Sequence, residues 1–238
     1  MNEHIRRLQI AAPSTPVKVY VKLNRPVDFP GCITFHGDDF IILCGQWADI
    51  APVLEAHRDE VTECMVEADR RNSRLPLMPL EQLNARVEPG AVIRQGAQIA
   101  DDAVIMMGAV VNVGAMIGSG TMVDMGAVIG GGARVGKNCH IGANAVLAGM
   151  IEPACTQPVV VDDGVLIGAG AVILEGVCVG RNAVVGAGAV VTGKMNAPAG
   201  SLILGNPATV VKPLTQAQID YIHADAENYI KLAQAQLG

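Results

Sequence analysis

Asp124 is an acidic residue in the segment GTMVDM, residues 120–125, within a long stretch that is otherwise almost entirely small and aliphatic. A carboxylate can accept a proton from a neighbouring group and can orient a hydrogen-bond donor beside it. The position alone fits equally well a solvated carboxylate on the outside of the protein, as at Glu88 and Asp162. The meaning of Asp124 therefore depends on the elements that position it.

His140, in the segment KNCHIGANA, is a second side chain that can transfer a proton. Histidine titrates near neutral pH and is a common general base. If the protein acted on a sugar or serine hydroxyl, His140 would be the leading base. It is the only one of the five histidines that lies in the repetitive part of the chain, whereas a catalytic metal site needs about three imidazoles. We therefore predict no metal site, and metal-dependent hydration is an improbable function.

A repeat of six residues determines how these side chains are placed. An aliphatic residue occurs at every sixth position from Val87 to Leu147, and again from Val161 to Val191. The residue four positions later is nearly always small, and Gly or Asn often precedes it, as in IGANAV and IGAGAV. This period fits neither an amphipathic helix nor a simple alternating strand. It predicts short strands joined by tight corners, with the aliphatic residue buried and the small residue at the bend.

The repeat is interrupted between Leu147 and Val161, where the segment AGMIEPACTQPVV contains two prolines. We predict that a loop leaves the coil near residues 148–160. Loops on a rigid scaffold often carry binding residues. A surface excursion without function is the alternative.

The two flanks of the repeat differ from it in pattern. Residues 17–46 alternate or run apolar between turn residues, which predicts short strands. From Asp49 to about Arg71, apolar residues recur at helical spacing, which predicts an amphipathic helix. Thr215 is placed to cap a C-terminal helix. We expect an N-terminal α/β cap domain over residues 1–80, a parallel β-helix over residues 81–212 and a C-terminal helix over residues 213–238.

The composition excludes several classes of protein. Half of the residues are hydrophobic but only 3% are aromatic, which fits a narrow interior of Val, Ile, Leu and Ala. No apolar run is long enough to span a bilayer, and the N-terminus lacks the apolar segment of a signal peptide, so we expect a cytoplasmic protein without a membrane partner. A net charge of -6 without a basic cluster argues against nucleic acid. Six widely spaced cysteines indicate neither a disulfide framework nor a zinc knuckle.

The six-residue pattern resembles that of the hexapeptide-repeat acyltransferases, whose chains wind into a triangular, left-handed parallel β-helix. The resemblance covers roughly residues 86–211. It implies a mainly β fold, a homotrimer with sites between subunits, and acetyl-CoA or another coenzyme A thioester as co-substrate, with no permanently bound cofactor. A purely structural β-solenoid that binds no thioester is the non-enzyme alternative.

A closer resemblance rests on R-x-x-P-G-A-x-I-R from Arg86 to Arg94, on GTMVDM, on VGKNCHIG and on LEGVCVG. These segments look like those of the tetrahydrodipicolinate N-acetyltransferases of lysine and diaminopimelate biosynthesis. Such enzymes acetylate the amino nitrogen of the ring-opened dicarboxylate, 2-amino-6-oxopimelate. The related N-succinyltransferases carry an arginine in the stretch that matches Ile167 to Gly170, where this chain has none. An acyl donor without a distal carboxylate needs no such cation, which favours acetyl over succinyl.

The same resemblance implies catalytic roles for Asp124 and Glu175. Two carboxylates in a partly dry cleft would push one pKa upward, and that group would be the better base near neutral pH. Counting hexads, however, puts Asp124 and Glu175 on different faces of the coil. If they share a site, it lies between neighbouring subunits.

Binding residues are expected for both the acceptor and the donor. A dicarboxylate requires cations, since guanidinium binds carboxylate bidentately. The candidates for this acceptor site are Arg94, Arg134, Lys137 and the polar Asn112. Small residues at bends would let a pantetheine arm approach the backbone, and a terminal turn with a lysine would meet the nucleotide phosphates. The candidates for this donor site are Gly168, Ala169, Gly186, Ala187, Gly205, Asn206, Pro207 and Lys212. Solvated arginines and ordinary corner glycines are the alternatives.

Overall fold

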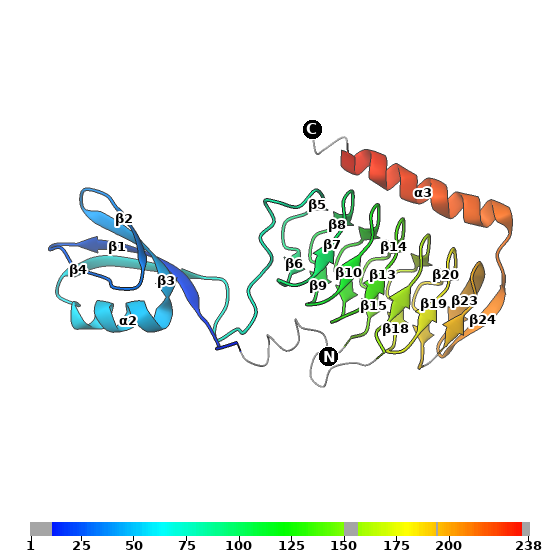
Figure 1. The fold of residues 1–238 in the computed structure, drawn as a ribbon, viewed down its shortest axis with the longest axis horizontal. Coiled ribbons are helices and arrows are strands. Elements are labelled where there is room, and N and C mark those ends of the chain that lie inside the picture. The colour runs from blue at the N-terminus through cyan, green and yellow to red at the C-terminus, as the bar shows by residue number, and fades with distance from the viewer. Residues whose placement is uncertain (1–10, 150–156, 194, 235–238) are drawn as a thin grey trace. The chain divides into compact units, whose positions relative to one another are not determined.

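The computed structural model describes residues 11–149, 157–193 and 195–234. The chain forms two compact units, one that ends at Pro76 and one that begins at Leu77, and each is described by itself. Most of the predicted loop at residues 148–160 lies outside the described residues. Figure 1 shows the elements of each unit.

The N-terminal unit is a four-stranded antiparallel sheet with a helix on one face. The sheet has the order β2-β3-β1-β4. Its elements are β1 (Pro16–Leu23), β2 (Ile33–His36), β3 (Phe40–Gln46), α2 (Trp47–Ala56) and β4 (Val61–Ala68). Alternation in PVKVYVKL buries Val19 and Val21, which pack with Leu43 of β3 and Ile50 of α2. The strands expected between residues 17 and 46 are confirmed.

The helix expected from Asp49 to about Arg71 is wrong in its second half. Helix α2 ends at Ala56, and the segment from Val61 to Ala68 forms β4, which pairs antiparallel with β1. The apolar residues of this segment recur at helical spacing, but most of its side chains are exposed, so the spacing does not mark a buried face. Backbone pairing with a strand about forty residues earlier in the chain, as between Tyr20 and Met65, decides its conformation.

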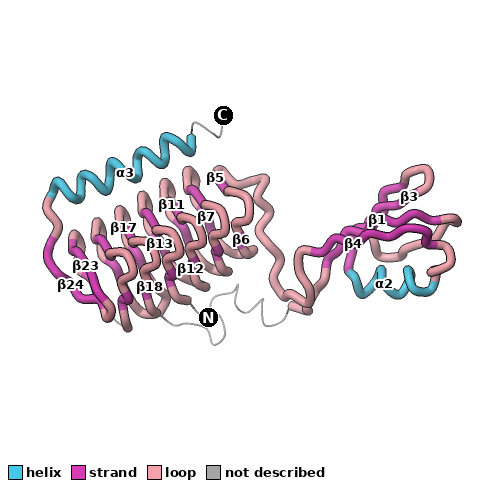
Figure 2. The backbone as a smooth tube through the Cα atoms, turned by 180° about the vertical axis from the view of Figure 1, so that it is seen from behind, coloured by secondary structure: helices cyan, strands magenta, loops and turns pink. Residues whose placement is uncertain are grey.

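The second unit is a left-handed parallel β-helix built from two-residue strands, one per hexad (Figure 2). Every third strand joins the same sheet, so the coil has three faces. The first face, the β11 sheet, contains β5 (Arg86–Val87), β8 (Val104–Ile105), β11 (Met122–Val123), β14 (His140–Ile141), β17 (Leu166–Ile167), β20 (Val184–Val185), β23 (Ser201–Gly205) and the antiparallel β24 (Ala208–Pro213).

The other two faces repeat this arrangement. The β12 sheet contains β6 (Val92–Ile93), β9 (Val110–Val111), β12 (Val128–Ile129), β15 (Val146–Leu147), β18 (Val172–Ile173) and β21 (Val190–Val191). The β13 sheet contains β7 (Gln98–Ile99), β10 (Met116–Ile117), β13 (Arg134–Val135), β16 (Val160–Val161), β19 (Cys178–Val179) and β22 (Asn196–Ala197). One coil, from Met122 to its partner His140, is 18 residues long.

The interior of the coil explains the repeat. Aliphatic residues such as Ile129 and Ile141 are completely buried, and so are the small residues such as Ala127 and Ala145 that follow the bends. The bend itself requires a left-handed backbone, as at Asn144 with a φ of 56°. Gly and Asn adopt this conformation most readily, which is why they precede the small residue.

Helix α3 (Gln216–Gln234) lies alongside the coils (Figure 1). Its Ile222 is buried, and Nε2 of its His223 lies 2.9 Å from Oδ1 of Asn182. In the described part of the chain, no helix has the length and apolar character needed to cross a membrane.

Thr121 and Cys139 replace alanine at two adjacent small-residue positions of the interior. The Thr121 hydroxyl donates to the Gly136 carbonyl at 2.7 Å and accepts from the Cys139 N–H at 3.0 Å. The Cys139 thiol lies 3.0 Å from the Asp162 carbonyl oxygen. Burial raises the pKa of this thiol to about 11. Thr121 therefore satisfies two backbone groups, and Cys139 is held protonated.

We predict that Thr121→Val destabilises the β-helix by about 1–3 kcal/mol, because it leaves the Gly136 carbonyl and the Cys139 N–H without their partner. Thr121→Ser keeps the hydroxyl and is the matched control. The free energy of unfolding, measured by denaturant titration, distinguishes the two variants. Equal stability of the valine and serine variants would contradict the role given to the hydroxyl.

We also predict that burial of Cys139 makes stability fall in alkaline solution. The unfolded thiol titrates near 9.0 and the folded thiol near about 11. Below pH 9 the thiol is protonated in both states, whereas between these values only the unfolded state releases the proton, so the free energy of unfolding falls. From about pH 8 to about pH 10.5, wild type should lose about 2 kcal/mol more than Cys139→Ala. Parallel curves for the two proteins would refute this prediction.

Candidate active site

The bends that follow the strands of the β11 sheet stack in one column, which we name the Asp124 corner. Its residues, in order along the coil, are Met106–Met107, Asp124–Met125, Gly142–Ala143, Gly168–Ala169 and Gly186–Ala187, and Leu204–Gly205 at the end of β23 continue the column. Hydrogen bonds join successive bends, because the N–H that follows each bend donates to the carbonyl of the preceding coil. Examples are Asn144 to Met125 at 2.9 Å and Gly170 to Ala143 at 2.8 Å. Asp124 therefore shares one corner with the predicted donor-binding residues.

Asp124 and His140 form a pair at this corner. Nε2 of His140 lies 3.5 Å from Oδ2 of Asp124, and the two side chains are 17% and 18% exposed. The other carboxylate oxygen of Asp124 accepts the Met125 N–H at 2.7 Å, which fixes its orientation. A half-buried carboxylate and an imidazole side by side can take up a proton from a bound reactant. The carboxylate then balances the positive charge of the protonated imidazole.

Small residues continue the Asp124 corner towards the C-terminus. A Cβ added to Gly142 would lie 2.7 Å from the Ala169 nitrogen, and one added to Gly168 would lie 2.3 Å from the Ala187 nitrogen. These contacts leave no space for a larger residue. Ala169 and Ala187 themselves are exposed. The two glycines thus allow the close approach of successive coils, and the exposed alanines leave the outside of these bends without large side chains.

The predicted closing turn lies between β23 and β24. Gly205 has a φ of 106°, and Asn206, Pro207 and Lys212 are exposed. Lys212 pairs with Leu202 across the hairpin, on the sheet that also contains β17 and β20. The cation is therefore at the C-terminal end of the sheet that leads into the Asp124 corner.

Arg94, Asn112 and Glu175 lie on a different corner, which follows the strands of the β12 sheet and which we name the Glu175 corner. Nη1 of Arg94 lies 3.5 Å from Oδ1 of Asn112, which also accepts the Val113 N–H at 2.8 Å. Glu175 is half-buried and lies four strands from Arg94 along this sheet, which is roughly 19 Å. The structure brings Arg94 and Asn112 together, and it places Asp124 and Glu175 on different faces, as the hexad count predicts.

Arg134 and Lys137 lie on neither of these corners. Arg134 is the first residue of β13 and is exposed. Lys137 is exposed at the bend that follows β13, where its N–H donates to Asp163 at 2.8 Å. Asp163 also accepts from Arg181 at 3.0 Å. Within one chain, these two cations are therefore not assembled with Asp124 or with Glu175.

Sequence reasoning missed the pairing of His140 with Asp124. It treated His140 only as a base for a hydroxyl acceptor, in place of Asp124. The spacing in the sequence could have predicted this contact, because the two residues are 16 positions apart and one coil is 18 residues long. A residue that opens one strand and a residue that follows the strand one coil earlier must be diagonal neighbours on the same face.

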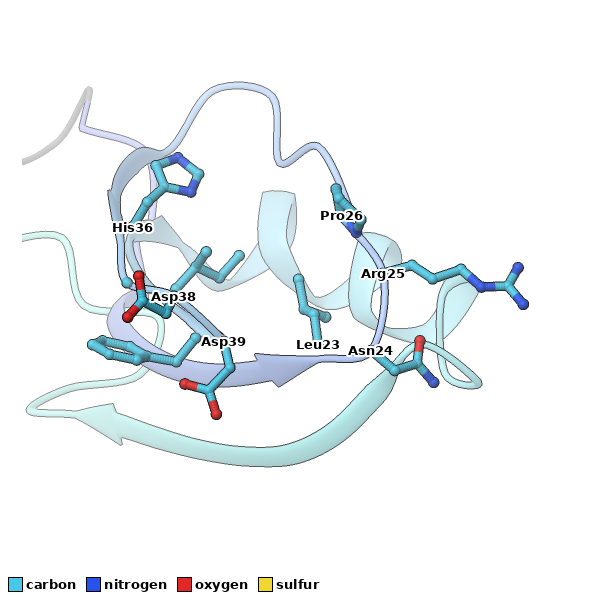
Figure 3. Close-up of a pocket in the computed structure, with 10 residues that line it drawn as sticks. Leu23, Asn24, Arg25, Pro26, His36, Asp38 and Asp39 are labelled. Carbon is cyan, nitrogen blue, oxygen red and sulfur yellow. The ribbon is translucent and has the colours of Figure 1, made fainter.

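The N-terminal unit contains a separate pocket of about 270 Å³ (Figure 3). It contains none of the predicted site residues. Arg25 points away from His36 and Asp38, so the charged groups do not converge on a common point. Among the residues that the structure describes, no cluster of His, Cys, Asp and Glu could hold a metal ion. All of the predicted site residues lie in the unit that contains the β-helix.

Two family models match the sequence. One, described as Tetrahydrodipicolinate succinyltransferase N-terminal, matches residues 1–80. The other, described as Bacterial transferase hexapeptide (six repeats), matches residues 114–149 and 158–193. The second match falls on the coils that carry Asp124, His140 and Glu175.

Similar proteins include two bacterial enzymes named 2,3,4,5-tetrahydropyridine-2,6-dicarboxylate N-acetyltransferase. The protein from Anoxybacillus flavithermus is 54% identical over 164 residues, which cover 68% of this chain and 70% of the relative. The protein from Listeria welshimeri is 51% identical over 158 residues, which cover 66% of this chain and 67% of the relative. These names specify an acetyl group, whereas the N-terminal family model is named for succinyl transfer.

Solved structures with similar coils include two acetyltransferases. PerB from Caulobacter crescentus, in complex with CoA and GDP-perosamine, is 30% identical, with coverage of 53% of this chain and 58% of that chain and a TM-score of 0.48. The acetyltransferase domain of PglB from Neisseria gonorrhoeae, in complex with acetyl coenzyme A, is 28% identical. Its coverage is 54% of this chain and 58% of that chain, and its TM-score is 0.48.

Proposed function

The chain belongs to the family of the 2,3,4,5-tetrahydropyridine-2,6-dicarboxylate N-acetyltransferases, and we propose that it transfers the acetyl group of acetyl-CoA to ring-opened tetrahydrodipicolinate. The acceptor is the amino nitrogen of 2-amino-6-oxopimelate, and the product is N-acetyl-2-amino-6-oxopimelate, an intermediate of lysine and diaminopimelate biosynthesis. The observation that carries the proposal is the identity above 50% with named N-acetyltransferases over the coils that hold the Asp124–His140 pair.

The reaction needs a proton acceptor beside the amine. The amino nitrogen forms a bond to the thioester carbonyl carbon, the carbon–sulfur bond breaks, and the nitrogen loses one proton. Asp124 is fixed by the Met125 N–H and lies beside His140, so it orients the amine while the pair accepts this proton. The departing coenzyme A sulfur takes up a proton and leaves as the thiol, which balances the reaction.

The donor lies along the small-residue part of the Asp124 corner. The pantetheine arm follows the bends at Gly186–Ala187 and Gly168–Ala169, where added side chains would meet the next coil. Its other end reaches the turn at Gly205, Asn206 and Pro207, and the Lys212 ammonium attracts the nucleotide phosphates. This direction brings the thioester to Asp124.

The acceptor carboxylates are bound by cations, and one chain alone does not supply a complete set at Asp124. Arg94, oriented by Asn112, is the best-placed group for one carboxylate. Arg134 and Lys137 are exposed on the third face. A closed homotrimer brings the Asp124 corner of one subunit to the Glu175 corner of the next, and the active site then lies between subunits.

A hexapeptide acetyltransferase for an amino sugar or a hydroxyl is the second candidate. The Asp124–His140 pair favours it, because a histidine held by a carboxylate also activates hydroxyl acceptors. The N-succinyltransferase is the third candidate, since the N-terminal family model is named for that activity. The three candidate activities differ in the acyl donor or in the acceptor that the enzyme uses, so an assay of both distinguishes them.

Coenzyme A release with tetrahydrodipicolinate should be rapid with acetyl-CoA and slow with succinyl-CoA. Asp124→Asn should lower kcat by about 10²-fold or more, because the amide cannot accept the proton, while the affinity for coenzyme A stays within about twofold. His140→Gln reports the contribution of the imidazole in the same assay. Preference for succinyl-CoA would reject the donor, and turnover only with amino sugars or hydroxyl compounds would reject the acceptor.

Mixed oligomers test whether the site lies between subunits. Asp124→Asn and Glu175→Gln should each be nearly inactive alone. Equal co-expression of the two should restore about a quarter of wild-type activity, because each half of a site comes from an intact chain with probability one half. The mass of the assembly, measured by light scattering, should be that of a trimer. Recovery near zero in a trimer of both variants would place the two residues in separate sites or in one chain.

A further inference from the structure

The side chains of the Asp124 corner change in size between two successive coils. The second residues of its bends are methionine at 107 and 125 and alanine at 143, 169 and 187. Met107 and Met125 are each 46% exposed, so they stand out from the corner. The Gly126 N–H donates to the Met107 carbonyl at 3.2 Å, and the Asn144 N–H donates to the Met125 carbonyl at 2.9 Å, so these bends lie on successive coils. The two methionines form a step where the run of alanines along the corner ends.

Apart from Arg86 and His140, the side chains of this corner around the step are apolar or acidic. Met106 packs against Val104 and Met122 on the outer face of the β11 sheet. The carboxylates of this end are Asp124 and, two coils before it, Glu88. Arg86 is engaged by the Glu88 carboxylate. His140 lies beside Asp124, so both described cations of this corner already face a carboxylate of the corner.

We infer that Met107 and Met125 close the donor site and restrict the enzyme to a short, uncharged acyl group. This inference rests on the proposed function. The thioester carbonyl lies where the amine held by Asp124 can attack it, so the acyl chain continues past the carbonyl towards the methionines. An acetyl methyl group ends beside Met125, where a thioether makes apolar contacts.

A succinyl group would extend about one coil further, and successive coils are about 4.8 Å apart. Its carboxylate would then lie beside Met107, between thioethers and carboxylates. A carboxylate placed beside other carboxylates, with no cation to bind it, is repelled by them. The step thus disfavours longer acyl groups by contact and negatively charged ones by charge repulsion. The determinant of the acyl donor lies on the β-helix rather than in the N-terminal unit, whose family model carries the succinyltransferase name.

Met116 provides a matched control. It is 40% exposed, nearly as much as the two methionines of the step, but it opens β10 on the β13 sheet. Met116→Ala removes an exposed thioether without touching the Asp124 corner. It should leave the choice of donor unchanged.

The test compares kcat/KM for acetyl-CoA, propionyl-CoA, butyryl-CoA and succinyl-CoA with tetrahydrodipicolinate as acceptor. Met125→Ala should raise the ratio of butyryl-CoA to acetyl-CoA by about tenfold or more, because each methylene accommodated changes specificity by about 10- to 200-fold. Met107→Arg should raise the ratio of succinyl-CoA to acetyl-CoA by about tenfold, because it supplies the missing cation. Met107→Leu, which keeps the step apolar, should leave that ratio unchanged.

The outcomes separate this inference from the proposed function. Acetyl transfer by wild type with donor ratios that stay within about twofold in Met125→Ala and Met107→Arg would overturn the inference alone. An equal loss of turnover with every donor, at unchanged coenzyme A affinity, would also overturn it, since the methionines would then only support the fold. Absence of acetyl transfer by wild type would overturn the proposed function, and the inference with it.

Discussion

The hydrogen bonds between successive coils are the constraint on which the β-helix depends. Each two-residue strand pairs with the strand one coil away, and the residue after each bend pairs in the same way. This ladder is regular only if every hexad has the same length and turns at the same place. An interior of aliphatic and very small residues satisfies that condition, because three strands per coil leave little room between the faces. The low aromatic content of the sequence is a consequence.

The same constraint decides where chemistry can occur. Inward positions are filled by the core, so functional side chains must lie on the outer faces or at the bends. Neighbours across coils then make the polar pairs, as Arg94 does with Asn112 and His140 with Asp124. Because each corner has its own column of side chains, one chain presents Asp124 and Glu175 in different directions. A site that uses both requires a second subunit.

Equivalent positions on successive coils of the Asp124 corner differ in side-chain size. Alanine at 143 and methionine at 125 occupy the same place on successive coils. The backbone is continuous through both, so side-chain size alone distinguishes the two bends. In such a scaffold, ligand specificity can change without disturbing the core.

The sequence by itself determined the short strands, the tight bends between them and the residues at those bends, and its resemblance to a known family implied the three faces and the left hand of the coil. It could do so because hexad periodicity is local: each six-residue unit repeats the same burial and the same bend. The tertiary structure decided which distant segments and side chains pair, because the periodicity of the sequence does not contain this information. Residues 61–68 form β4 through pairing with a distant strand, although their spacing suits a helix. His140 becomes the partner of Asp124 only when the coil closes, because contacts between coils join residues whose separation depends on the length of the turn.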